Sequence, residues 1–102
     1  MTLNEYQNLR QVYTVYPKTN QFDGLFYSVL ALCGESGELA NKLKKFIRSK
    51  TDPVPAVLAD ELGDVLWYVA AVASELGMTL EEVAQMNLDK LAARKAADRV
   101  TG

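Results

Sequence analysis

Residues 54–76 decide the expected fold, and they read VPAVLADELGDVLWYVAAVASEL. Apolar residues recur every three or four positions in this stretch, which places them on one face of an α-helix. The residues on that face are Leu58, Leu62, Val65, Val69, Val72 and Leu76. Pro55 suits the first helical turn, and Gly77 suits the left-handed position that often follows a helix. The stretch therefore predicts one long amphipathic helix.

A second long helix is expected upstream, from Asp23 or Gly24 to about Arg48. Its apolar positions also recur at helical spacing: Leu25, Val29, Leu32, Leu39, Leu43 and Phe46. Residues 49–55 are polar and contain two prolines, so they are expected to connect the two helices.

Two capping boxes predict the remaining helices. Thr2 with Glu5 opens a helix from Leu3 to about Val15, and Thr79 with Glu82 opens another to about Ala97. The residues expected to face inward from the last helix are Leu80, Val83, Ala84, Met86, Asn87 and Leu91. Four helices with short connections and no strand alternation predict an all-α fold, a four-helix bundle in a single domain spanning residues 1–102.

Two pairs of carboxylates interrupt the long apolar helices. Glu35 and Glu38 lie three residues apart in one, and Glu61 and Asp64 lie three residues apart in the other. Residues at this spacing share a helix face, so the two acids of each pair repel each other. Two such pairs on neighbouring helices, each bordering an apolar face, indicate a positive ion between them. A hard divalent cation with oxygen ligands fits this chemistry.

The composition limits the kind of site. The chain of 102 residues contains no histidine and one cysteine, Cys33. The lack of histidine excludes His-assisted nucleophiles, His-containing zinc sites and the Glu-x-x-His type of di-iron bundle. A metal here must therefore be held by carboxylates, carbonyls and water, which points to Mg²⁺, with Mn²⁺ as the alternative.

Charge and hydropathy argue against nucleic-acid and membrane partners. The formal net charge is −2, which gives no basis for binding nucleic acid or an anionic membrane. The longest apolar run, Val65 to Ala73, is too short to span a bilayer. With no signal peptide and a single cysteine, the chain is expected to be cytoplasmic.

Polar residues of the last helix form a stripe. Asn87, Lys90 and Arg94 stand three and four positions apart, so they share one face. They are either ordinary surface residues or ligands for phosphate oxygens beside the metal.

Three further residues are candidates for ligand contact. Tyr68 follows Asp64 by four residues and is the better candidate to touch a substrate ring or sugar, while Trp67 is a candidate to stack on a base. Both residue types are more often part of a core. Lys42 follows Glu38 by four residues, so a simple helix salt bridge also accounts for it.

Two stretches resemble the core motifs of the MazG-like group of all-α nucleoside triphosphate pyrophosphohydrolases. They are residues 32–42, LCGESGELANK, and residues 60–68, DELGDVLWY. Residues 87–91, NLDKL, resemble a third motif of the group, and the likeness runs from Tyr6 to Arg94. The paired acidic motif with these flanks is specific, whereas either pair alone would be weak.

The resemblance implies cleavage of a nucleoside triphosphate to the monophosphate and pyrophosphate with Mg²⁺. It implies that Glu35, Glu38, Glu61 and Asp64 are the metal ligands. It places Asn87, Lys90 and Arg94 near the triphosphate, and Tyr68 near the nucleoside. Hydrolysis needs a base for the attacking water, and we expect Glu38 to be that base.

The resemblance also implies an oligomer, either a homodimer or a homotetramer. The broad apolar faces of the two long helices agree, since they exceed what a small monomer needs to bury. Gln7 and Phe22 are candidates to cover the base from a neighbouring subunit. Many relatives continue with a Gly-rich basic segment, whereas this sequence stops at Gly102.

Three alternatives stay open from the sequence. Two are enzymes of the same fold, a phosphoribosyl-ATP pyrophosphohydrolase and a dUTPase-like relative. The third is a non-catalytic helical module that binds a nucleotide or a partner helix.

Overall fold

The structure is a computed structural model, and it describes residues 1–17 and 20–101, with side chains described as far as residue 98. The described part of the chain is all-helical, as predicted. The elements are α1 (Leu3–Leu9), the 3₁₀-helix η1 (Arg10–Tyr13), α2 (Asp23–Ser49), α3 (Pro55–Glu75) and α4 (Leu80–Thr101).

The first helix is shorter than predicted. Thr2 caps it as expected, because its Oγ1 accepts the Glu5 N–H at 3.1 Å. The α-helix ends at Leu9, however, and the chain tightens into η1 instead of continuing to Val15. Short 3₁₀ segments are common at helix ends. The change begins at Arg10, which is buried and whose side chain reaches α3.

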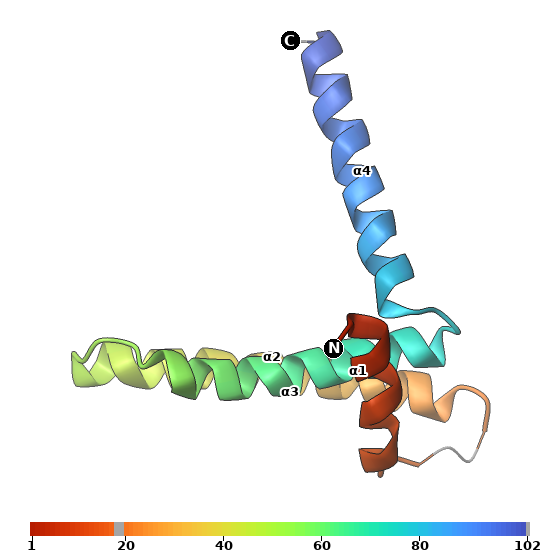
Figure 1. Ribbon diagram of the computed structural model, residues 1–102. Helices are drawn as coiled ribbons and strands as arrows, with labels where there is room; N and C mark the ends of the chain where they lie inside the picture. The colour runs from red at the N-terminus through yellow and green to blue at the C-terminus, as the bar shows by residue number, and fades with distance from the viewer. Residues whose placement is uncertain (18–19, 102) are drawn as a thin grey trace.

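The helices α2 and α3 form a long antiparallel hairpin (Figure 1). The sequence predicted their bounds closely: α2 ends at a left-handed Lys50, and α3 begins with Pro55 in its first turn. Small residues allow the helices to approach closely at one end. Ala71 on α3 and Ser28 on α2 are fully buried, and Gly24 on α2 faces the Glu75 carboxylate of α3.

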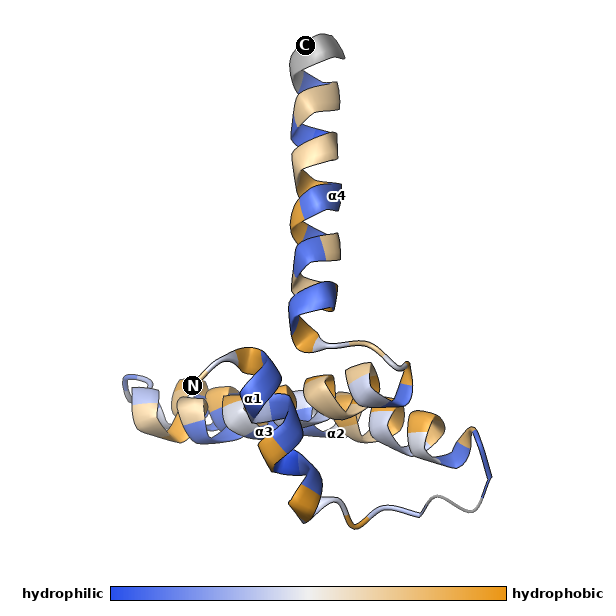
Figure 2. Ribbon diagram, turned by 45° about the vertical axis from the view of Figure 1, so that its right-hand side comes forward, coloured by the Kyte–Doolittle hydropathy of each residue, from blue (hydrophilic) through white to orange (hydrophobic). Residues whose placement is uncertain are grey.

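The helix α4 departs from the predicted bundle. It begins as expected, since Thr79 Oγ1 accepts the Glu82 N–H at 3.1 Å and Glu82 Oε1 accepts the Thr79 N–H at 3.2 Å. Beyond this cap it projects away from the hairpin with no helix beside it (Figures 1 and 2). The radius of gyration is 17.1 Å, whereas a compact chain of this length has about 13 Å. The prediction that all four helices share one core is therefore wrong for the single chain.

Among the described side chains of α4, only Leu80 is buried, and Val83 is half-buried. Leu80 packs with Ala70 and Ala73, with Tyr6, Val69 and Val83 beside them. The other residues predicted to face inward from α4 are exposed to solvent: Ala84, Met86, Asn87 and Leu91. The prediction that these residues face inward is therefore confirmed for Leu80 and Val83 only, and no described part of the chain covers the others.

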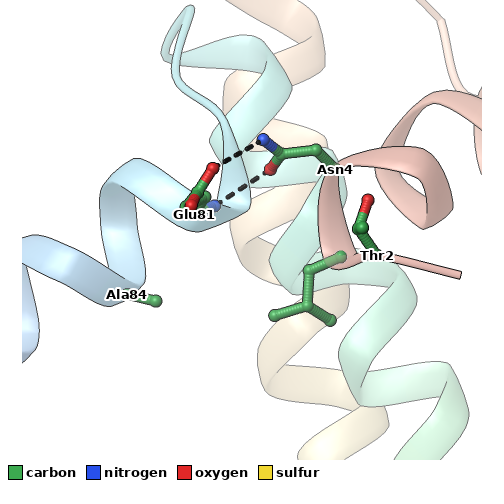
Figure 3. A pocket seen from close by; sticks show the side chains of 5 residues that line it. Thr2, Asn4, Glu81 and Ala84 are labelled. Atoms are coloured by element: carbon green, nitrogen blue, oxygen red, sulfur yellow. Dashed lines mark hydrogen bonds between the residues drawn. The ribbon is translucent and has the colours of Figure 1, made fainter.

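The helix α1 holds the base of α4. The Asn4 side chain accepts the Glu81 N–H at 3.0 Å and donates to Glu81 Oε2 at 3.3 Å, beside a hollow of about 310 Å³ (Figure 3). Gln7 is buried nearby and accepts the Leu80 N–H at 2.8 Å. Its amide nitrogen donates to Ser74 Oγ and to the Met78 carbonyl. Gln7 is thus occupied within its own chain, and the expectation that it covers a neighbour's base is not supported.

Candidate active site

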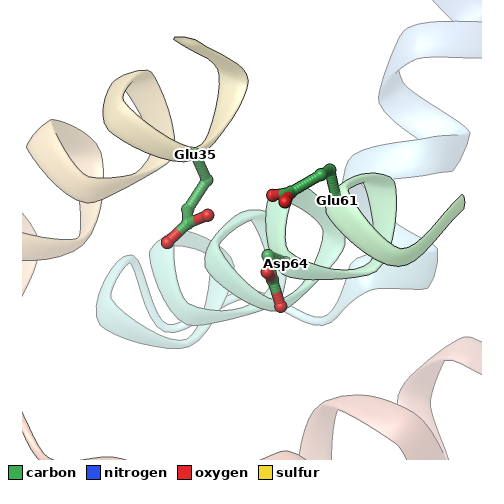
Figure 4. Close-up of side chains that lie close together, drawn as sticks. All are labelled: Glu35, Glu61 and Asp64. Carbon is green, nitrogen blue, oxygen red and sulfur yellow. The ribbon is translucent and has the colours of Figure 1, made fainter. Parts of the chain in front are cut away.

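Three of the four predicted metal ligands converge between α2 and α3. Glu35 comes from α2, and Glu61 and Asp64 come from α3 (Figure 4). One carboxylate oxygen of each lies within 4.8 Å of the others. Two oxygens bound to one Mg²⁺ at about 2.1 Å can be at most about 4.2 Å apart. Neighbouring oxygens of an octahedral Mg²⁺ lie about 3 Å apart, so each side chain would need to move by about an ångström for all three to bind one ion.

The electrostatics of this acid cluster, Glu35, Glu61 and Asp64, also favour a cation. Burial raises the pKa of the Glu35 carboxyl, and the negative charges of Asp64, Glu61 and Glu38 raise it further. A raised carboxyl pKa means that the ionised form is disfavoured where it stands. A bound cation would remove this penalty, so the cluster fits a hard divalent ion.

Glu38 lies beside the acid cluster without being part of it. It is exposed, and among the described residues it is absent from the group whose oxygens converge within 4.8 Å. It is still near enough for its charge to raise the pKa of Glu35. The structure therefore separates Glu38 from the other three acids in position.

Lys42 connects the two helices of the hairpin. Its Nζ lies 4.0 Å from Glu61 Oε1, so it reaches across to α3. The within-helix pairing with Glu38 that the spacing allowed is not the contact formed. Lys42 supplies one positive charge at the edge of the acid cluster.

Aromatic side chains build a pocket against the acids. The pocket has a volume of about 290 Å³ and is lined by Tyr13, Glu35, Asp64, Trp67 and Tyr68. Burial raises the pKa of the Tyr68 hydroxyl, and Tyr27 and the acids Glu35 and Asp64 raise it further. The structure thus brings both predicted aromatic residues next to two of the predicted metal ligands.

The buried side chain of Arg10 packs against the ring of Trp67. The Arg10 guanidinium lies 4.9 Å from the centre of the Trp67 ring, and the side chain of Arg10 is only 4% exposed. Its Nη2 donates to Ser74 Oγ at 3.0 Å and to the Ala70 carbonyl at 3.5 Å. Its Nε and Nη1 are buried without a hydrogen-bond partner in the described part of the chain. The rings of Tyr16 and Tyr68 contact Trp67 edge-on.

The predicted phosphate-binding stripe lies apart from the acids. Asn87, Lys90 and Arg94 are exposed on the projecting part of α4 (Figure 1). Within one chain, the structure does not bring them to the acid cluster.

Comparison with known proteins shows to which family the chain belongs. Residues 27–97 match the MazG nucleotide pyrophosphohydrolase domain, a match that covers more than half of the chain and includes the acid cluster. The chain belongs to the MazG family. This MazG chain is also 39% identical over 109 aligned residues to the Gene 37 protein of Mycobacterium phage L5. That match covers 100% of the chain and 96% of the relative. No solved structure gives a significant match.

Two residues of the site were missed by sequence reasoning. Tyr13 belongs to η1, outside the region that matches the family, and it reaches the pocket only because η1 lies across the hairpin. Arg10 sits in a polar stretch where an exposed cation is the ordinary expectation. No local pattern indicated either position. Separately, none of the described helices is long and apolar enough to cross a membrane.

Proposed function

We propose that this MazG chain is a Mg²⁺-dependent nucleoside triphosphate pyrophosphohydrolase, which converts a (d)NTP to the (d)NMP and pyrophosphate. Membership of the family establishes the broader class, hydrolases of nucleotide pyrophosphate bonds. The observation that carries the finer proposal is the convergence of Glu35, Glu61 and Asp64 within 4.8 Å. A single domain spanning residues 1–102 would carry the whole activity.

The carboxylates have separate tasks in this proposal. Glu35, Glu61 and Asp64 would hold the metal, with Mg²⁺ favoured and Mn²⁺ able to replace it because both accept oxygen ligands. The bound ion would neutralise phosphate charge and lower the pKa of a water. Lys42, already beside Glu61, would add positive charge at the phosphates.

Glu38 is the proposed general base. It is exposed and stands outside the acid cluster, so its carboxylate is free to accept a proton. The attacking water forms a bond to phosphorus while the phosphoanhydride bond breaks, and Glu38 takes the proton of the water. No covalent intermediate is needed, which suits a chain without histidine and without an activated nucleophile.

The aromatic pocket is the proposed nucleoside site. Trp67 offers a ring for base stacking, and Tyr68 lines the same pocket beside Glu35 and Asp64. A nucleoside in this pocket would leave its phosphates directed to the acid cluster. A substrate of this kind also fits the expected cytoplasmic location, where nucleoside triphosphates are abundant.

We further propose that the chain forms a homodimer, or a homotetramer made from two dimers. The single chain exposes 7508 Å², whereas a folded monomer of its mass exposes about 5,700 Å². The excess of about 1,800 Å² exceeds the ~800 Å² that each partner buries in a standard interface. Much of it is apolar: on α3, Ala59, Leu62, Val65, Leu66 and Val69 line a groove of about 500 Å³. Light scattering that gives a stable monomer at micromolar concentration would contradict this.

The activity is tested with a substrate panel. The protein is incubated with Mg²⁺ and ribo- and deoxyribonucleoside triphosphates, including dUTP, and with phosphoribosyl-ATP. Monophosphate and pyrophosphate are followed by chromatography. We expect pyrophosphate release that is lost in Glu38→Ala and Glu61→Gln, and kept in the matched control Asp60→Asn, an exposed acid on α3 outside the acid cluster.

The other outcomes are equally informative. Turnover of dUTP alone would indicate a dUTPase-like enzyme, and turnover of phosphoribosyl-ATP alone would indicate the other related activity. No turnover of any compound by the folded protein would overturn the proposed function and favour a non-catalytic binding module.

A further inference from the structure

Arg10 is a buried cation without a counter-ion in its own chain. Among the described residues, no carboxylate forms an ion pair with it. Its Nη2 donates to Ser74 Oγ and to the Ala70 carbonyl, which leaves Nε and Nη1 without an oxygen partner. Burying a charge in this way is strongly unfavourable, so the position of Arg10 needs an explanation beyond packing.

The ring of Trp67 is the group that contacts this charge. The guanidinium carbon lies 4.9 Å from the ring centre, within the range of a cation–π contact. The π face is the acceptor that remains for the two N–H groups without an oxygen partner. Trp67 lines the aromatic pocket, whereas Arg10 is not among the described residues that line it. Arg10 therefore contacts the ring from the core side, and a positive charge lies behind the ring that the pocket uses.

Without Arg10, the composition of the pocket would suit a cationic ligand. Tyr13, Trp67 and Tyr68 line a volume of about 290 Å³ together with the carboxylates of two acids. Cages of aromatic rings bind quaternary ammonium groups, because the negative ring faces attract a cation. A guanidinium on the tryptophan opposes this attraction, since it already uses the negative charge of the ring face and repels a second cation directly. A neutral aromatic ring is not repelled.

We propose that Arg10 is a specificity-determining residue, which positions the ring of Trp67 and makes the aromatic pocket select neutral nucleobases over positively charged ones. Arg10 acts through Trp67 and does not touch the substrate. The preference among bases rests on the proposed function, whereas the contact between Arg10 and Trp67 does not.

The distance from Arg10 to the base sets the size of the effect. A base stacked on the pocket side of Trp67 lies about 4.5 Å from the ring centre, and therefore about 9 Å from the guanidinium. At that distance a positive charge on the base weakens binding about twofold at the dielectric constant of water, and about twentyfold at the effective value near a protein surface. Removal of the Arg10 charge should restore this factor.

Binding of paired nucleotides tests the selection. Each pair is a nucleoside monophosphate and its methylated, cationic form: AMP with 1-methyl-AMP, GMP with 7-methyl-GMP, and CMP with 3-methyl-CMP. Dissociation constants are measured by titration calorimetry in slightly acidic buffer, where the methylated bases carry a positive charge. The ratio within each pair is compared between wild type and Arg10→Met, so that the effect of the methyl group cancels. We expect the cationic form to gain about twofold to twentyfold over the neutral form in Arg10→Met.

Further variants separate the charge of the side chain from its shape. Arg10→Lys keeps the positive charge, so its ratios should stay close to those of wild type. Arg10→Gln removes the charge and keeps a hydrogen-bond donor, so it should behave like Arg10→Met. Arg48→Met is the matched control, because it removes an exposed cation about 20 Å along α2 from Glu35. It should leave the ratios unchanged.

The fluorescence of Trp67 tests the contact without any ligand. Trp67 is the single tryptophan of the chain, and a charge close to an indole ring shifts its emission maximum. We expect a shift in Arg10→Met and in Arg10→Gln, and none in Arg48→Met. Identical emission spectra of wild type and the neutral Arg10 variants, all of them folded, would overturn the role of Arg10 at the ring.

The binding results also separate this proposal from the proposed function. Ratios that are equal in wild type and in the neutral Arg10 variants, with the nucleotides still bound, would overturn the selection and leave the nucleoside site standing. A wild-type protein that binds none of the neutral nucleotides would instead count against the nucleoside site itself, and the selection would fall with it.

Discussion

Glu61→Gln should stabilise the protein without metal and destabilise it with metal. Glu61 faces Glu35 and Asp64 within 4.8 Å, and Lys42 lies 4.0 Å away. At these distances each like-charge pair costs about 0.9 kcal/mol in water and about 3.5 kcal/mol at the effective dielectric constant near a protein surface. After subtracting the attraction of Lys42, the net repulsion on Glu61 is about 0.7 to 2.8 kcal/mol.

The lower end of this range applies, because Asp64 is exposed and water screens its charge. We therefore expect the variant to gain about 1 kcal/mol in free energy of unfolding in EDTA, or about 4–8 °C in Tm. Glutamine keeps the size of the side chain, so packing changes little. Asp60→Asn on the same helix should shift Tm by much less in either direction.

Adding Mg²⁺ should reverse the order of stability, so that the wild type becomes more stable than Glu61→Gln. An ion present at a hundred times its Kd stabilises the native state by about 2.7 kcal/mol, and the variant binds it more weakly because a ligand is missing. The assay is thermal unfolding followed by circular dichroism at one fixed protein concentration, with EDTA and with a series of Mg²⁺ concentrations. A variant that is less stable than wild type in EDTA would refute the reasoning, since Glu61 would then be a structural partner. A Tm of wild type that does not respond to Mg²⁺ would refute the metal site.

Three further predictions concern other parts of the molecule. The pKa of Glu35 is raised above its ordinary value, so the folded state holds the carboxyl proton more tightly than the unfolded state does. In EDTA the free energy of unfolding should therefore rise as the pH falls from 7 toward 5. Urea titrations in which the free energy of unfolding falls over this range would contradict the prediction. Gly24→Ala places a Cβ 2.5 Å from Glu75 Oε1, so the Glu75 carboxylate must shift and its 3.0 Å hydrogen bond from the Tyr16 hydroxyl is disturbed. Because the carboxylate is the far end of a flexible side chain, we expect a loss of about 1 kcal/mol in urea unfolding, and a loss above about 3 kcal/mol would show that Glu75 cannot move aside. Trp67 is the single tryptophan of the chain, so a nucleoside monophosphate bound in the aromatic pocket should quench its fluorescence. The Tyr13→Ala variant should bind the monophosphate about threefold to tenfold more weakly. Unchanged binding would show that Tyr13 does not contact the nucleoside.

Local sequence patterns were sufficient to predict the two long helices and the approach of their acids to one another. Apolar periodicity predicted α2 and α3. The capping box of Thr79 and Glu82, together with Gly77, predicted the junction before α4. The hairpin then brought Glu35 to Glu61 and Asp64 because two long antiparallel helices leave little freedom in their pairing. The convergence of three carboxylates, which depends on one helical pair, could therefore be predicted from the sequence.

The predictions that failed concern features that depend on packing between segments far apart in the sequence. The periodic apolar positions indicate that one face of α4 must be covered, but they do not indicate which chain covers it. The 3₁₀ turn at Arg10 and the approach of Tyr13 to the pocket follow from how η1 crosses α3, for which the sequence carries no local signal. Glu38 has the same spacing as Asp64 within its pair, yet its place on the helix turns it out of the acid cluster.

The small residues at one end of the hairpin have a consequence for ion selectivity. Ser28 and Ala71 are fully buried, and each lies one helical turn from the contact of Gly24 with Glu75, toward the acids. A larger side chain at either position would push the helix axes apart and widen the gap between Glu35 and Asp64. Mg²⁺ binds oxygen at about 2.0–2.1 Å and Ca²⁺ at about 2.3–2.6 Å, so such a change would favour the larger ion. The radius of the ion that the proposed site would accept thus depends on residues that would not touch it.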